Sequence, residues 1–154
     1  MPVMRSHEGN RPLANAQPYG SSELAAFTAY CSRVYRALKP YHQALGREYR
    51  ERGLPFMRAL FMHYPEETKS WEQAYEYLYG RDLLIAPVVK SGVKKRRVWL
   101  PGDEWIHLWT GTEYGGGTHL VDAPFGKPAV FYRKSTSWKE LFESLLKIEH
   151  KEFA

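Results

Sequence analysis

A loop rich in hydrogen-bonding side chains near the amino terminus holds the strongest candidates for chemistry in this sequence. Residues 5–12 read Arg-Ser-His-Glu-Gly-Asn-Arg-Pro. The imidazole of His7 can donate a hydrogen bond to a ligand hydroxyl or accept one, and the guanidinium of Arg5 is a planar fork of donors that can brace the loop or a nearby carboxylate. Composition alone also allows a plain exposed loop, because His7 has no metal-ligand spacing with any other His or Cys.

The familiar catalytic motifs are absent from the rest of the sequence. It has no His-Glu-x-x-His pair, no phosphate-binding glycine loop, no Gly-x-Ser-x-Gly elbow and no cysteine in a reactive setting. The sequence also offers poor candidates for a pair of catalytic carboxyl groups that would act as acid and base. Asp82 opens an apolar run, Asp103 lies in a Pro-Gly turn and Asp122 precedes Ala-Pro, which predicts turn and cap roles. Glu8, beside His7, is the one glutamate of interest. We therefore predict no catalytic residue, metal site or cofactor in this chain.

Composition predicts an ordinary folded protein of one domain, or a small domain with part of another. The chain has 154 residues, of which 44% are hydrophobic, 25% charged and 15% aromatic. The net charge is +5, but the only dense basic run, residues 94–97, precedes a strand-like Val-Trp-Leu segment and is expected to be a solvated turn. No nucleic-acid partner is predicted, because no binding signature accompanies that run.

Three features bear on location. No run of about 18 apolar residues occurs, and the amino terminus lacks signal-peptide architecture, so neither a membrane partner nor secretion is predicted. The single cysteine, Cys31, falls in a helical apolar pattern, which predicts a buried, inert thiol. A reducing compartment fits, and cytoplasmic localisation is the expectation.

The elements that must position the polar loop begin with a long bent helix. Apolar residues recur every three or four positions from residue 24 to residue 38. Ser22 is a plausible cap, Pro40 should kink the helix, and Gly53 should end it. The nearly continuous apolar run over 54–62 then predicts a strand covered on both faces, which is typical of parallel sheets. The preceding strand that a βαβ unit requires is missing from this chain.

A second group of elements has a different pattern. A short helix is predicted from Pro65 to Gly80, with a capping box at Ser70 and Gln73 and with Trp71, Tyr75 and Leu78 on one side. Strand-like runs separated by turn residues then predict an antiparallel β-sandwich, with strands over 83–89, 97–100, 105–109, 119–121 and 129–133. A final amphipathic helix is predicted to start with a capping box at Ser137 and Glu140. The fold class is therefore α+β.

The order of short motifs along nearly the whole chain resembles the end of glycoside hydrolase family 31, a family of α-glycosidases. The motifs are Arg-Ser-His at 5–7, Leu-Lys-Pro-Tyr at 38–41, Gly-Leu-Pro-Phe-Met-Arg-Ala-Leu-Phe at 53–61, Tyr-Pro at 64–65, Tyr-Leu-Tyr-Gly-Arg-Asp-Leu-Leu-Ile-Ala-Pro-Val at 77–88, Leu-Pro-Gly at 100–102, Trp-Ile-His-Leu-Trp-Thr-Gly at 105–111 and Tyr-Gly-Gly at 114–116. No single motif is specific, but their joint order is. The family includes α-glucosidases, and residues 4–12 look most similar to its bacterial sulfoquinovosidase branch.

The resemblance implies a particular fold and division into domains. Residues 1–64 would be the end of a catalytic (β/α)₈ barrel, consisting of one long helix and the last strand. Residues 65–154 would be the proximal C-terminal β-sandwich domain with flanking helices, which supports the barrel. In such barrels the active site lies at the C-terminal ends of the strands, where a loop that enters the last helix can reach the substrate.

The resemblance also implies a function, the hydrolysis of O-glycosyl bonds in α-glycosides with retention of configuration. His7 matches the histidine of the family's Arg-x-His motif, which binds sugar hydroxyls in the cleavage subsite, and Arg5 matches the supporting arginine. The family's nucleophile and acid/base are aspartates on earlier barrel strands, and nothing here resembles their surroundings. The expected partners are therefore a carbohydrate substrate and the missing N-terminal part of the enzyme, and the chain alone should be inactive.

Two alternatives come from other functional classes. One is a free-standing, non-catalytic carbohydrate-binding module that uses Trp99, Trp105 and Trp109; their spacing and the turn beside Trp99 favour core packing instead. The other is a structural β-module that completes a separately encoded barrel. The start at Met1 within the first motif is expected from a truncated or split reading frame.

Overall fold

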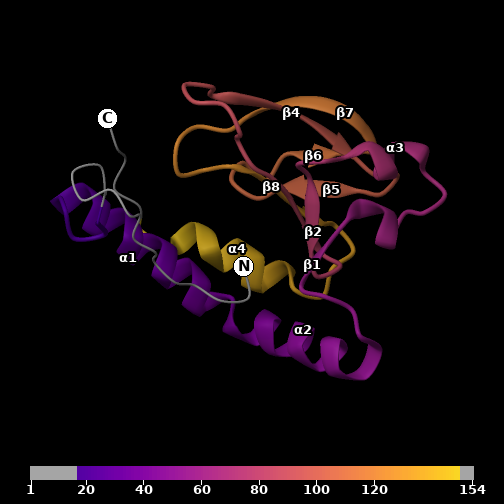
Figure 1. Cartoon of the computed structure of the whole chain (residues 1–154), viewed down its shortest axis with the longest axis horizontal. Helices are drawn as coiled ribbons and strands as arrows, with labels where there is room; N and C mark the ends of the chain where they lie inside the picture. Colours follow the sequence, from indigo (N-terminus) through magenta and orange to yellow (C-terminus); the bar gives the residue numbers. More distant parts are fainter. Residues whose placement is uncertain (1–16, 150–154) are drawn as a thin grey trace.

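The computed structural model describes residues 17–149, which form a layer of helices beside two antiparallel sheets (Figure 1). The helices are α1 (Ser22–Ala37), α2 (Lys39–Arg52), α3 (Thr68–Glu72) and α4 (Lys139–Ser144), with 3-10 turns η1 (Leu60–Met62) and η2 (Leu145–Lys147). The strands are β1 (Met57–Arg58), β2 (Tyr77–Tyr79), β3 (Leu83–Ala86), β4 (Lys95–Leu100), β5 (Trp105–His107), β6 (Glu113–Tyr114), β7 (Gly117–Asp122) and β8 (Ala129–Arg133).

The long bent helix is confirmed as two segments, α1 and α2, which are broken at Leu38. Ser21, one residue before the predicted cap, accepts a hydrogen bond from the backbone N–H of Leu24 (3.1 Å). Pro40 lies in the first turn of α2, where its missing N–H costs no helical hydrogen bond. Gly53 ends α2 with φ +70°, a left-handed conformation that glycine adopts without steric penalty.

The larger sheet has six strands in the order β1-β2-β3-β8-β5-β6, and every pair is antiparallel. Strand β8 lies inside this sheet, with Phe131 opposite Leu84 of β3 on one side and His107 of β5 on the other. The second sheet is the β4–β7 ribbon, which Figure 1 shows above the larger sheet, opposite the helices. The antiparallel sandwich is thereby confirmed.

Alternation along the strands builds two hydrophobic cores, one on each face of the larger sheet. Leu84 and Phe131 point to the core that the β4–β7 ribbon closes, where Trp105 is fully buried. Their neighbours point to the core that the helices close, which contains the following buried side chains: Tyr41, Leu45, Tyr79, Leu83, Ile106, Leu108, Val130, Tyr132, Phe142 and Leu145. The period of two therefore places one sheet between a helical layer and a second sheet.

Two predicted elements before residue 80 are wrong in extent. The strand expected over 54–62 is only β1, Met57–Arg58, and in this chain it pairs antiparallel with β2 at the sheet edge. Of the helix expected from Pro65 to Gly80, only α3 (Thr68–Glu72) forms, and Tyr77–Tyr79 form strand β2 instead. Ser70 is not a cap, because its buried hydroxyl donates to the carbonyl of Tyr64 (2.7 Å). The sheet thus crosses the predicted domain division at residues 64/65; that division and the barrel assignment stay predictions.

Three smaller expectations also need correction. The basic run at 94–97 is not a solvated turn, because Lys95, Arg96 and Arg97 belong to β4. The capping box predicted for the last helix is absent: α4 follows Trp138, which has no side-chain cap bond. Cys31 is half-buried, not fully buried, and burial raises the pKa of its thiol. In residues 17–149, no helix is long and apolar enough to cross a membrane.

Candidate functional site

The two residues predicted to bind substrate, Arg5 and His7, lie outside the described residues. In the sequence they precede α1, whose N-cap is Ser21. Their role therefore stays a prediction, and the same holds for Glu8. The polar groups that the structure does place include two buried clusters, a separate buried carboxylate and one groove lined by cations.

The first cluster surrounds Arg58, whose side chain is fully buried on β1. The guanidinium donates to the carbonyl of Pro55 (2.7 Å) and to Nε2 of His63 (3.0 Å), and it pairs with the carboxylate of Glu48 on α2. Burial, followed by the charges of Arg58 and Arg133, lowers the pKa of His63 to about 4. His63 is thus neutral at pH 7 and accepts a hydrogen bond. The cluster joins α2, β1 and η1.

The second cluster surrounds Arg133 at the end of β8. Its guanidinium pairs with Asp103, donates to the hydroxyl of Tyr64 (2.7 Å) and lies 5.6 Å from the ring centroids of Tyr64 and Trp105. The Tyr64 hydroxyl donates to Asp103 (3.3 Å), and burial raises its pKa. Asp103 also accepts from the N–H of Glu104 (3.0 Å), as its predicted turn role requires. The arrangement fixes the 101–104 turn against β8.

The other aspartates also have structural partners. Asp82 has a hydrogen bond with the Thr136 side chain, although burial raises the pKa of its carboxyl. Asp122 lies 3.7 Å from Lys95 across the β4–β7 ribbon, and both are exposed. In the part of the chain that the structure describes, no group of three or more His, Cys, Asp or Glu could hold a metal ion.

One buried carboxylate, Glu76, was not singled out from the sequence. Its side chain is 4% exposed, accepts from the backbone N–H of Trp99 (3.2 Å) and lies 3.8 Å from the guanidinium of Arg96. Burial raises the pKa of this carboxyl to about 7. Because Trp99 and Arg96 are on β4 and Glu76 immediately precedes β2, the contact joins the two sheets. Only a three-dimensional contact reveals it, since nothing in the Tyr-Glu-Tyr sequence marks the residue.

The tryptophans proposed for a carbohydrate-binding module pack inward. Trp105 is fully buried and its indole donates to Pro101 O (3.1 Å), while Trp99 is 8% exposed. Trp109 is partly buried, and its indole donates to the carbonyl of Pro128 (2.6 Å). Neither Trp99 nor Trp105 offers a ring face to a sugar. The core-packing interpretation of these two residues is confirmed.

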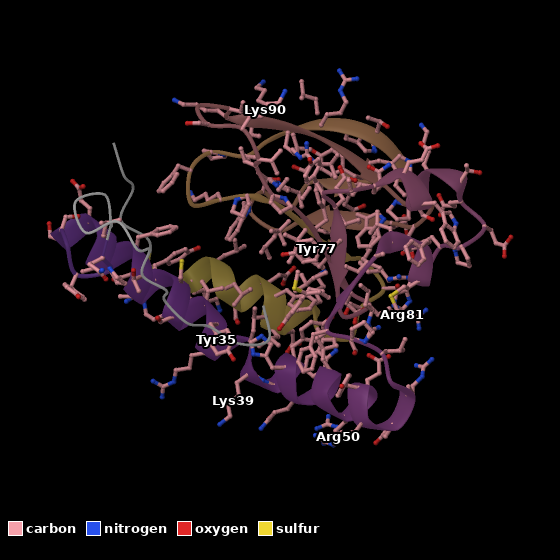
Figure 2. All side chains as sticks on the ribbon, in the orientation of Figure 1. Tyr35, Lys39, Arg50, Tyr77, Arg81 and Lys90 are labelled. Carbon is pink, nitrogen blue, oxygen red and sulfur yellow. The ribbon has the colours of Figure 1, made fainter. Side chains whose placement is uncertain are left out.

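A groove of about 660 Å³ lies along the outer side of α1 and α2, and we call it the basic groove. It is lined by Tyr35, Arg36, Lys39, His42, Gln43, Gly46, Arg47, Arg50 and Phe56. Four of these residues are cationic and none is acidic. Figure 2 shows Lys39 and Arg50 on the side of α2 that points away from the sheets.

Residues 53–136, more than half of the chain, match the family model for the glycosyl hydrolase family 31 C-terminal domain. The chain belongs to glycoside hydrolase family 31. The matched span runs from the C-cap of α2 to just beyond β8, so it contains both sheets, the Arg133 cluster and all of the Arg58 cluster except Glu48. This match confirms the resemblance to family 31 that the order of the sequence motifs indicated.

Similarity within the family is greatest, among the relatives compared, to sulfoquinovosidases. The enzyme of Escherichia coli (strain K12) is 45% identical over 147 residues, covering 96% of this chain and 22% of that protein. The enzyme of Agrobacterium fabrum is 46% identical over 146 residues, covering 94% and 22%. By contrast, the 1,3-alpha-isomaltosidase of Kribbella flavida is 30% identical, covering 92% and 21%.

The fold comparison agrees with the sequence comparison. The solved structure of a family 31 sulfoquinovosidase from E. rectale, in complex with the aza-sugar inhibitor IFGSQ, superposes with a TM-score of 0.91 at 44% identity. It covers 95% of this chain and 22% of that one. The chain thus spans about one-fifth of the length of the relatives that it matches.

Proposed function

We propose that this chain acts as the C-terminal part of a sulfoquinovosidase-type family 31 enzyme, which hydrolyses the O-glycosyl bond of an α-glycoside with retention of configuration. The observation that carries the proposal is the 45–46% identity to two sulfoquinovosidases, against 30% to the isomaltosidase, across more than nine-tenths of the chain. Its partners would be the carbohydrate and the preceding part of the enzyme.

Within that enzyme the proposed substrate-binding residues are His7 and Arg5. A neutral imidazole that bonds a sugar hydroxyl contributes most when the bond strengthens as the ring flattens toward the oxocarbenium-like transition state. His7 would therefore bind the transition state and transfer no proton. Arg5 would hold the loop. The nucleophile and the acid/base, both aspartates in this family by the resemblance described above, would come from the preceding part.

The remaining residues have a supporting role in this proposal. The helix-side core and the Arg58 cluster hold the helices against the larger sheet, while the other core and the Arg133 cluster hold the β-domain together, so a loop that precedes α1 has a fixed base. Rigid support is what substrate positioning requires. We also propose a cytoplasmic location, on the basis of the single cysteine, and no cofactor.

The test of the proposal is a chimera in which this chain replaces the matching one-fifth of the E. coli sulfoquinovosidase. The chimera should hydrolyse an aryl α-sulfoquinovoside, and His7→Ala should lower its kcat about 100- to 1000-fold, the usual cost of one hydrogen bond made to a transition state. His119→Ala on β7 is the matched control and should leave kcat unchanged. A folded chimera without hydrolysis would refute the proposal.

The isolated chain gives a second test. Without a nucleophile and an acid, binding groups alone cannot lower the barrier to glycoside hydrolysis sufficiently, so the purified chain should show no turnover of the aryl α-sulfoquinovoside. The measurement is release of the aryl group over many hours at high protein concentration. Turnover that His7→Ala abolishes would show that the chain carries its own catalytic groups.

A further inference from the structure

The basic groove has an unbalanced charge. Arg36, Lys39, Arg47 and Arg50 are exposed, and none of them pairs with a carboxylate anywhere in residues 17–149. The contrast is with Arg52, one turn from Glu48, whose carboxylate it contacts at 3.2 Å. Four neighbouring cations that form no ion pair within residues 17–149 repel one another, so the groove attracts anionic groups.

One stripe of α2 forms a side of the groove. Lys39, Gln43, Gly46 and Arg50 are spaced by four, three and four residues, which places them on one stripe of α2. The opposite stripe, with Tyr41 and Leu45, is buried against the larger sheet. Gly46 leaves room in the middle, since the nearest side-chain atom to a Cβ there would be the Phe56 ring at 3.7 Å.

Half-buried aromatic groups also line the groove. Tyr35 and His42 have ring centroids 4.8 Å apart, and burial lowers the pKa of His42, so its ring is neutral at pH 7. Phe56 is also half-buried. Aromatic side chains together with exposed cations are a usual composition of an interface.

We propose that the basic groove is the docking surface for an acidic face of the preceding part of the family 31 enzyme. This inference rests on the proposed function and names the surface through which the chain meets its partner. The curated relatives carry more than three-quarters of their length outside the matched region, so a large partner is implied. Covering four cations with an apolar surface would bury unpaired charge at high cost, so the partner must bring carboxylates.

Charge reversal in the chimera described above tests the inference. Arg47→Glu together with Arg50→Glu should lower the midpoint temperature of the chimera by about 3 °C or more, and the effect should shrink in 1 M salt. Arg47→Gln together with Arg50→Gln should give a smaller drop, which shows that loss of attraction and not misfolding is the cause. In the isolated chain the Glu variants should leave the midpoint unchanged or raise it, because they relieve repulsion within the groove.

A matched control reverses two exposed cations elsewhere, with Lys90→Glu and Arg97→Glu. Lys90 lies on the far side of the molecule from α2 (Figure 2), and this pair should not change the midpoint of the chimera. An equal drop in the control, or no drop in the Arg47 and Arg50 variants, would overturn the inference.

Other occupants predict different results. If a second copy fills the groove, the isolated chain will be a dimer in light scattering and the Glu variants will be monomeric. If a small anion fills it, millimolar sulfate will stabilise the isolated chain and the Glu variants will lose that effect. Either result would overturn the inference. Activity is a separate readout: a folded, inactive chimera that still responds to charge reversal would refute the proposed function and leave the docking surface standing.

Discussion

At the scale of single residues, the buried charge of Arg58 holds three segments of the chain together. Arg58 has no exposed side-chain surface, and three partners from three segments satisfy its guanidinium: Glu48, His63 and the carbonyl of Pro55. A buried ion pair contributes little when compared with an apolar pair, but the removal of one member leaves the other without compensation. A single substitution in the cluster therefore destabilises the fold more than one in a surface ion pair does.

Arg58→Met should destabilise the chain by about 3–5 kcal/mol, because Glu48 and His63 lose their partner inside the protein. Urea unfolding followed by tryptophan fluorescence measures the change. Arg97→Met, an exposed arginine on the neighbouring sheet, is the control and should stay within about 0.5 kcal/mol of the parent. A cost for Arg58→Met no larger than that of the control would show that the cluster is solvated.

Glu76 leads to a prediction about pH. The folded state holds the pKa of Glu76 near 7, whereas an unfolded chain has the ordinary value of 4.5. Between these values the folded state binds the extra proton, so the contribution of Glu76 to stability is largest below about pH 4.5 and falls as pH rises through about 7. The shift corresponds to a loss on the order of 3 kcal/mol at pH 8.

Glu76→Gln should remove that loss, because glutamine can still accept from the N–H of Trp99 without burying a charge. The difference between the free energies of unfolding of the variant and of the parent should increase in favour of the variant as pH rises from 5 to 8, as measured by urea titration at each pH. The control is Asp122→Asn, a substitution at an exposed position on β7. Its free energy of unfolding should differ from that of the parent by the same amount at each pH from 5 to 8. A constant difference between Glu76→Gln and the parent would show that the carboxyl titrates normally.

At the scale of elements, the turn at Gly80 between β2 and β3 holds the helices close to the sheet. Gly80 has φ +66°, its N–H donates to Phe56 O (2.7 Å), and an added Cβ would stand 2.2 Å from the Tyr41 hydroxyl and 2.6 Å from Leu45. Only glycine allows α2 to lie this near the turn.

Gly80→Ala should therefore cost more than Gly53→Ala, although both residues have positive φ. At Gly53 nothing lies within 4 Å of the added Cβ, so the cost is the conformational one of about 1–2 kcal/mol. At Gly80 the clash with Tyr41 and Leu45 is added, and the total should exceed about 3 kcal/mol. Thermal and urea unfolding of the two variants give the comparison. Equal costs would mean that α2 moves away freely.

The elements also show which patterns in the sequence were reliable. The β-rich runs over 83–89 and 129–133, bounded by turn residues, predicted β3 and β8 correctly, although β3 ends at Ala86; successive residues in both strands face one or the other of the two cores. The helix expected up to Gly80 was wrong because Trp71, Tyr75 and Leu78 fall at helical spacing by coincidence: Trp71 and Tyr75 are each 60% exposed and Leu78 is fully buried. Periodicity cannot distinguish a buried face from three aromatic and aliphatic residues in different elements.

At the scale of the whole molecule, the motifs predicted more than the local patterns did. Their order predicted family 31 membership, which a match over residues 53–136 confirms. The same motifs did not mark Arg58, Glu76 or Arg133 as members of buried clusters, because those partners are distant in the sequence, as in the contact between Arg133 and Tyr64. The role of His7 depends on a family motif and on no contact described here, so it could be predicted but not tested by the fold.

The position of β8 determines the order in which this molecule can fold. Among the strands of residues 17–149, β8 is the last to be synthesised, yet it joins β3 to β5 and so unites two sets of strands. A nascent chain that has emerged only as far as residue 128 would hold β1-β2-β3 and β5-β6 as separate pieces with apolar faces open to water. The larger sheet can therefore close only after residues 129–133 have left the ribosome, and until then the exposed apolar faces would favour association or chaperone binding.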